Sequence, residues 1–260
     1  MSKEKMNMNV ESLQSLENQE QIPNVEVLAI IGHSIEEDTT RGWVPTRLIQ
    51  KMDESKKRTG VRDRGLGPDD ERAYVGGGNA VALAAAEMYE TLIARGSPPR
   101  AVSVVPGRPL YLEKAPPDVN EGTVMLDAFK KKVKHLPDTF ITLGAARNTQ
   151  GELEQHLRMC VERGYKSIGF VLLDLRIERA EAILERLKAE HPEFSSLETK
   201  CISAETLLRH RYQDEPERLV QVEKMLKAFS VSAAATKTVT DEKGGAEAIR
   251  QGTYKGKGNY

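Results

Sequence analysis

The sequence of 260 residues predicts an α/β protein built on a doubly wound, Rossmann-like, mostly parallel sheet in a single domain. Short, mostly apolar runs of strand length recur along the chain, as expected for strands that are buried on both faces of a parallel sheet. Amphipathic segments of helix length separate these runs, and this alternation is typical of βαβ units. The composition, 39% hydrophobic and 30% charged residues, is that of an ordinary globular protein.

Five strands are expected, each from a short apolar run. The first covers residues 25–31, is rich in β-branched side chains and ends at Gly32. The remaining strands are expected over residues 101–105, 139–143, 167–173 and 197–202.

Helices are expected between the strands, where apolar residues recur with helical spacing. The first helix should begin at Asn79, a candidate N-cap, and stop at Gly96. Another should open at Thr149, because Thr149 and Glu152 have the spacing of a capping box. Further helices are expected over residues 122–133, 177–187 and 216–229.

Three segments fall outside this alternation. The first and the last of them bound a domain over residues 23–231, and the second lies within it. Residues 1–22 are polar and are expected to form a disordered lead-in. Residues 36–78 form a long charged connection, which is either a functional lid or locally disordered. Residues 232–260 are expected to be a basic, flexible C-terminal tail.

Charge and composition exclude several classes of partner. Lys and Arg (38) nearly balance Asp and Glu (39), so no overall field attracts nucleic acid or membrane. Aromatic residues are only 5%, which leaves few platforms for base stacking and disfavours a nucleic-acid partner. No apolar signal region and no run of about 18 apolar residues is present, so we expect a cytoplasmic protein without a membrane span. Cys160 and Cys201 lack metal-site spacing and are predicted to be buried, reduced thiols.

The candidate ligand-binding residues lie in the loops that follow the predicted strands. In an open parallel sheet, ligands bind outside the carboxyl ends of the strands. Arginines close to helix N-termini at this edge suit a phosphate or a carboxylate, so the sequence predicts an anionic small molecule as ligand. The candidates are Gly32, Gly107, Arg108, Arg147, Asn148, Thr149, Asp174, Arg176 and Arg179.

Structural explanations compete with these functional ones. A capping box at Thr149 needs no ligand, and Arg176 and Arg179 at the start of a helix could balance Asp174 or a neighbouring glutamate. Gly76–Gly78 before a helix resembles a phosphate-binding nest, but it lacks the lysine of a P-loop and the spacing of GxGxxG.

His33 and Glu36, just after the first strand, are the candidate catalytic groups. A lone histidine is more often structural than catalytic. Glu36, Glu37 and Asp38 could hold Mg²⁺ near a phosphate, although runs of acidic residues are usually only solvated. The sequence contains no GxSxG or HExxH motif, no paired-cysteine site and no nicotinamide or flavin fingerprint, which disfavours a serine hydrolase, a zinc enzyme or a redox enzyme.

Residues 146–152, 164–168 and 176–180 resemble the YdcF-like proteins, a family of unknown function that includes SanA and ElyC. Asn148 and Thr149 match the family's Ser-x-Asn-Thr element, and Arg179 and Ala180 match the end of its Thr-Ser-x-x-His-x-x-Arg-Ala loop. Weaker matches are Gly107, in place of the family's glycine turn, and Glu121, in place of the acidic residue after it. The similarity covers about residues 25–205.

The resemblance implies a Rossmann-like sheet and a nucleotide-like ligand such as S-adenosylmethionine, but no known reaction. Several residues depart from the family pattern and remove a hydroxyl or acid/base group: Pro106, Ala146, Leu172, Leu173 and Arg176, the last of which replaces the histidine. A binding role therefore survives these departures better than catalysis does. If the protein is an enzyme, group transfer or hydrolysis is expected. The alternative is a non-enzymatic interaction protein that docks a partner through residues 36–78 and the basic tail.

Overall fold

The computed structural model describes residues 22–32, 35–38, 40–48, 75–107, 115–146 and 148–254. Five parallel strands form one sheet in the order β5-β4-β1-β6-β7. Their bounds are β1 Val27–Ile30, β4 Ala101–Val104, β5 Phe140–Thr142, β6 Ser167–Leu172 and β7 Glu198–Ser203. Each lies within a residue or two of a predicted strand.

The strand order makes the sheet doubly wound. β1 lies at the centre and pairs through Val27–Ile30 with β4 on one side and β6 on the other. The chain passes from β1 to β4 and β5, and then returns across the sheet to β6 and β7. The predicted fold class is confirmed, because this reversal of direction at β1 is the feature that defines a Rossmann-like sheet.

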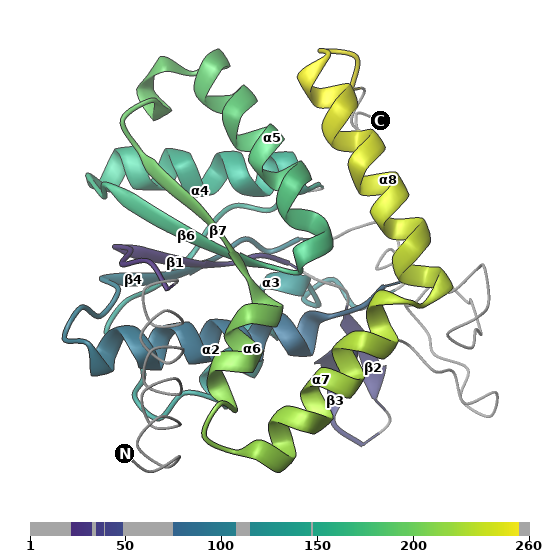
Figure 1. Cartoon of the computed structure of the whole chain (residues 1–260). Coiled ribbons are helices and arrows are strands. Elements are labelled where there is room, and N and C mark those ends of the chain that lie inside the picture. Colours follow the sequence, from purple (N-terminus) through teal and green to yellow (C-terminus); the bar gives the residue numbers. More distant parts are fainter. Residues whose placement is uncertain are drawn as a thin grey trace, which may run out of the picture.

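Helices cover both faces of the sheet (Figure 1). On one face lie α2 Gly78–Ala94, α3 Glu121–Lys130, α6 Ala204–Arg211 and α7 Pro216–Ser230, and on the other lie α4 Thr149–Arg163 and α5 Asp174–Glu190. A 3₁₀ turn, η2 Pro192–Phe194, follows α5. Leu28 and Ile30 of β1 pack into the first core, whereas Val27 and Ala29 pack into the second. Burial on both faces is why the strands are continuously apolar in sequence.

A small antiparallel hairpin follows β1, formed by β2 Ile35–Asp38 and β3 Gly42–Pro45. The chain after it runs beside the glycine segment 76–78: the N–H groups of Gly76, Gly77 and Asn79 donate to backbone carbonyls of residues 46–48 at 2.9–3.2 Å. These N–H groups are therefore not available to a phosphate, and α2 is capped by Gly77 instead of Asn79. The rest of the predicted lid, residues 49–74, lies outside the described residues, as do residues 1–21.

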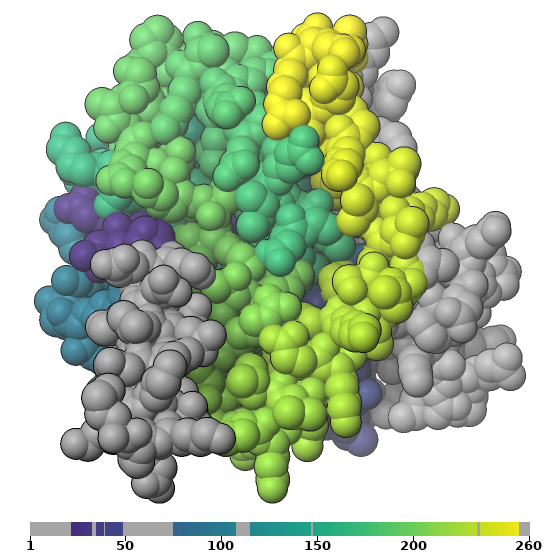
Figure 2. Space-filling view, viewed as in Figure 1, coloured from purple at the N-terminus to yellow at the C-terminus, as the bar shows by residue number. Residues whose placement is uncertain are grey.

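The expected flexible tail is wrong over most of its length, because α8 covers Ala233–Arg250. Ser232 caps this helix by accepting the Ala235 N–H at 3.1 Å. Ala246 and Ile249 bury themselves in the core beside α5, and α8 is visible in yellow along α5 in Figure 2. α8 contains two glycines, Gly244 and Gly245, so its own helix propensity is low and packing against α5 stabilises it.

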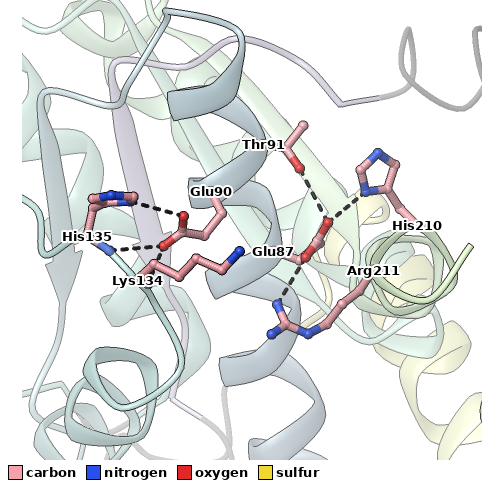
Figure 3. A network of polar contacts seen from close by, with 7 residues as sticks. All are labelled: Glu87, Glu90, Thr91, Lys134, His135, His210 and Arg211. Carbon is pink, nitrogen blue, oxygen red and sulfur yellow. Dashed lines mark hydrogen bonds and ion pairs between the residues drawn. The ribbon is translucent and has the colours of Figure 1, made fainter. Parts of the chain in front are cut away.

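Polar contacts, some of them half-buried, fix α2 against its neighbours (Figure 3). Glu87 accepts a hydrogen bond from His210 at 2.8 Å and one from Arg211 at 3.0 Å, both on α6. Burial alone would raise the pKa of Glu87, but the hydrogen bonds and charges of these two residues hold that pKa below its ordinary value. One turn further along α2, Glu90 accepts the backbone N–H groups of Lys134 and His135. α2 is thereby tied to α6 and to the segment after α3.

No helix among the described residues is both long and apolar enough to cross a membrane.

A substitution at Gly77 tests how closely α2 packs against the sheet. Its φ is +106°, and a Cβ there would lie 2.5 Å from Leu173 Cδ1, just after β6. We expect Gly77→Ala to destabilise the fold by about 3 kcal/mol in urea denaturation, since left-handed backbone costs about 1 kcal/mol and crowding adds roughly 1–3 kcal/mol.

The matched control is Gly164→Ala, at φ +71° with no atom within 4 Å of the added Cβ. This variant should lose only about 1 kcal/mol of stability, which is the cost of the left-handed backbone conformation. Equal losses of stability in the two variants would show that the Leu173 side chain does not limit how closely the start of α2 packs against it.

Candidate functional site

The candidate site lies at the carboxyl ends of β1 and β6, where the sheet changes winding direction. Chain connections leave these adjacent strands toward opposite sides of the sheet, which opens a crevice between them in doubly wound folds. Gly32 follows β1 here, and Leu173 follows β6. Gly107 follows β4 and pairs with Ala146 after β5, which brings the loops of the neighbouring strands to the same edge.

Two glutamates flank Gly32. Glu152 of α4 accepts the Gly32 backbone N–H at 2.6 Å. A Cβ on residue 32 would lie 3.0 Å from Glu121 Oε2 and 3.2 Å from Glu152 Oε1, so both carboxyl groups lie close to the Gly32 backbone. Glu121 is the first residue of α3 and is held by its own N–H, which donates to the Gly107 carbonyl at 2.9 Å. The crevice therefore contains a pair of adjacent carboxyl groups.

Glu152 is the acid of this pair that holds a proton near neutral pH. Burial raises the pKa of Glu152 to about 8, and the charge of Glu121 adds to the shift. The Gly32 N–H and the charge of Arg176 oppose this rise without cancelling it. A carboxylic acid that titrates near neutral pH beside a second carboxyl group can donate or accept a proton during a reaction.

Arg176 places a positive charge beside these acids. It is the third residue of α5, so it lies in the first helical turn, where a cation is unfavourable unless an anion compensates it. Its Nε is buried without a hydrogen-bond partner, and its side chain forms no ion pair with a described residue. Only its longer-range electrostatic effect on Glu152 is seen. This guanidinium has donors to spare for a ligand anion.

Asp174, the first residue of α5, belongs to a second carboxyl pair. Its backbone N–H donates to Glu205 Oε2 of α6 at 3.0 Å. Glu205 is buried, and burial together with the charge of Asp174 raises the pKa of Glu205 to about 7. Asp174 itself is exposed at the helix start.

The remaining predicted residues are used differently or lie elsewhere. Arg179 contacts α8 instead of the crevice: it forms an ion pair with Glu242 at 3.2 Å and a hydrogen bond with the Tyr254 hydroxyl. Glu36 is buried in β2, opposite Val44. His33, Arg108 and Arg147 lie outside the described residues.

The predicted capping box at Thr149 is wrong. Asn148 is the N-cap of α4, and its side chain accepts the Gly151 N–H at 2.8 Å. Thr149 is only the first helical residue. This shift frees Glu152 from the cap and lets it reach Gly32.

The predicted magnesium ligands do not converge. Asp38 accepts hydrogen bonds from Thr40 and from Arg41 at 2.7–3.1 Å. Glu36 and Glu37 are successive strand residues, whose side chains point to opposite faces. No group of three histidine, cysteine or acidic residues in the described part of the chain could hold a metal ion.

Sequence reasoning missed three buried polar residues. Besides Glu205, these are His156 of α4 and Ser103 of β4, whose Nδ1 and Oγ lie 3.0 Å apart. Burial lowers the pKa of His156 to about 3, so this histidine is neutral. A serine inside an apolar strand, and a histidine four residues after Glu152, are the signals that could have revealed them.

Comparisons with known proteins leave the family open. No protein-family model matches the chain, and no curated protein or solved structure gave a match. The resemblance to the YdcF-like proteins therefore stays a prediction, and the site rests on its own geometry.

Substitution of Glu152 by glutamine tests its protonation. A pKa raised in the folded state means that folding is favoured by the bound proton, so the contribution of Glu152 to stability falls as pH rises toward about 8. Glutamine stays neutral and can still accept the Gly32 N–H. We expect the stability of Glu152→Gln relative to the parent protein to increase by about 3–4 kcal/mol between pH 5 and pH 8.

Glu162→Gln, at an exposed position of the same helix, is the control and should show no such trend. Denaturation curves at several pH values measure both variants. A constant difference for Glu152→Gln would mean that its carboxyl is ionised throughout.

Proposed function

We propose that this protein binds an anionic, nucleotide-like small molecule in the crevice between the ends of β1 and β6. The observation that carries the proposal is Arg176 at the start of α5, which forms no ion pair and whose buried Nε has no hydrogen-bond partner among the described residues. A guanidinium in this position needs an anion. The phosphate of a nucleotide or the carboxylate of S-adenosylmethionine has the required charge and geometry.

Glu121 and Glu152 supply contacts for the uncharged part of such a ligand. A carboxylate accepts hydrogen bonds from sugar hydroxyls or amino groups, and a protonated carboxyl can also donate one. Gly32 and Gly107 carry no side chain, which leaves room for the Glu121 carboxyl group beside both strand ends. Nucleotides and S-adenosylmethionine combine an anion with hydroxyl and amino groups, which is why they are our first candidates.

If a reaction takes place in the crevice, group transfer or hydrolysis fits its acids. Glu152 holds a proton at neutral pH and could transfer it to a leaving oxygen, while Glu121 accepts a proton from an attacking hydroxyl or water. Arg176 would stabilise the anionic group during the transfer.

A ligand screen on the purified chain tests this proposal. Nucleotides, S-adenosylmethionine and sugar phosphates are compared by thermal shift, and hits are titrated by calorimetry. We expect a stabilising ligand, because only binding to the native state raises stability. Arg176→Ala should weaken the affinity for this ligand at least about tenfold, which is the effect of losing a charge-assisted contact.

Arg158→Ala is the matched control, since Arg158 is exposed on α4, where it forms an ion pair with Glu154 and contacts the Phe194 ring. It should bind the ligand as the parent chain does. The proposal is wrong if no candidate stabilises the protein, or if the affinity is indifferent to Arg176.

A further inference from the structure

A cavity of about 640 Å³ lies over the second half of the sheet, between the starts of α5 and α6 and the helices α7 and α8. Its volume is in the range of small-molecule sites. Arg176, Glu152 and Gly32 do not line it, so it is distinct from the crevice at β1. It lies at the carboxyl ends of β6 and β7, because α5 and α6 begin directly after these strands.

One wall of this cavity carries the Asp174–Glu205 pair. Glu205 is only 5% exposed, and its Oε2 accepts the Asp174 N–H at 3.0 Å. Neither carboxyl group forms an ion pair with a described residue. Arg209, the cation that α6 contributes to the lining, is already paired with Glu223 at 2.7 Å. The wall therefore has negative charge that no ion pair compensates.

α7 and α8 supply most of the apolar side chains of the lining. Leu226 and Phe229 of α7 are buried and line the cavity, and α8 contributes Ala235 and Val239. Lys227 is the remaining cation of the lining and is exposed on α7, where solvent screens its charge. A cavity lined by an acidic pair and by apolar side chains suits a ligand with a positive head and an apolar body.

We propose that this cavity is a second ligand site, which binds a small protonated amine with an apolar body. The ammonium group would lie between Asp174 and Glu205, and the body would pack against Leu226 and Phe229. The amine could belong to a simple organic amine or to an amino acid, since both carry the same ammonium group.

Binding of the amine should be coupled to the ionisation of Glu205. Its pKa is about 7, so at pH 6 most molecules hold a proton there and must release it to receive an ammonium group. The other charged groups that line the cavity are Asp174 of α5, Arg209 of α6, and Glu223 and Lys227 of α7. α8 contributes no charged group to it.

Calorimetric titration of the full chain with phenethylamine tests the site, with N-acetylphenethylamine as the uncharged analogue. We expect the amine to bind and the amide not to bind. Affinity should increase about tenfold from pH 6 to pH 8, with release of close to one proton per amine at pH 6, as single-site linkage requires. Phenylalanine, tested beside phenethylamine, shows whether a carboxylate on the ligand strengthens or weakens binding.

Glu205→Gln is the decisive variant, because glutamine can still accept the Asp174 N–H and so preserves the start of α5. It should lose at least about tenfold in affinity and all of the pH dependence. Glu217→Gln, an exposed α7 variant with the same charge change outside the cavity, should bind normally. Arg176→Ala should also retain amine binding, which separates this site from the crevice.

Two results would overturn the proposal. One is the absence of binding by phenethylamine and phenylalanine up to about 10 mM, which corresponds to less than about 3 kcal/mol of binding energy. The other is equal binding of the amine and its acetyl derivative, or of the parent chain and Glu205→Gln. Either result would show that the carboxyl pair does not recognise an ammonium group.

Discussion

The central strand β1 must end inside the protein, and the hydrogen bond from Gly32 to Glu152 is what makes this ending stable. A buried backbone N–H without a partner costs free energy comparable to a lost hydrogen bond. Glu152 supplies the acceptor from α4, 120 residues further along the chain. This bond joins the first βα half of the sheet to the second, at the point where the winding reverses. It also buries a carboxyl group at the edge where ligands bind in such folds.

The same arrangement, a buried glutamate that accepts a backbone N–H, occurs twice at this edge of the sheet. Glu205 accepts the N–H of Asp174 at the start of α5, much as Glu152 accepts that of Gly32 at the end of β1. In each case burial raises the pKa of the glutamate toward or above neutral, and a second acidic residue lies beside it. The two glutamates thus accept hydrogen bonds from backbone N–H groups and can still exchange protons near neutral pH. The charge of Arg176 acts on the first pair, and this is why we propose an anionic ligand there and a cationic one at the second pair.

The sequence predicts the sheet well because its signal is local. An apolar run of five or six residues can be recognised without its neighbours, and all five runs became strands. The site is predicted less well, because its contacts are long-range. Thr149 and Glu152 have capping-box spacing, but Asn148 forms the cap and Glu152 turns to Gly32. α8 was missed because its two glycines and many threonines indicate a coil, and only the packing of Ala246 and Ile249 against α5 makes it a helix.

The first two arginines of α5 show why helical spacing alone cannot assign a ligand contact. Arg176 and Arg179 are three residues apart and were both expected at the crevice. Arg179, which matches the YdcF-like pattern, is instead held between Glu242 and Tyr254 of the C-terminal segment, and the Cβ-free surface of Gly245 lets it lie against α8. Arg176, which departs from that pattern, is the one that forms no ion pair within the described part of the chain. Because a guanidinium stays charged at all physiological pH values, Arg176 can attract anions but cannot transfer protons. Proton transfer in the crevice would then depend on the buried acid Glu152. The charge of Arg176 lowers the pKa of Glu152, which burial would otherwise raise further.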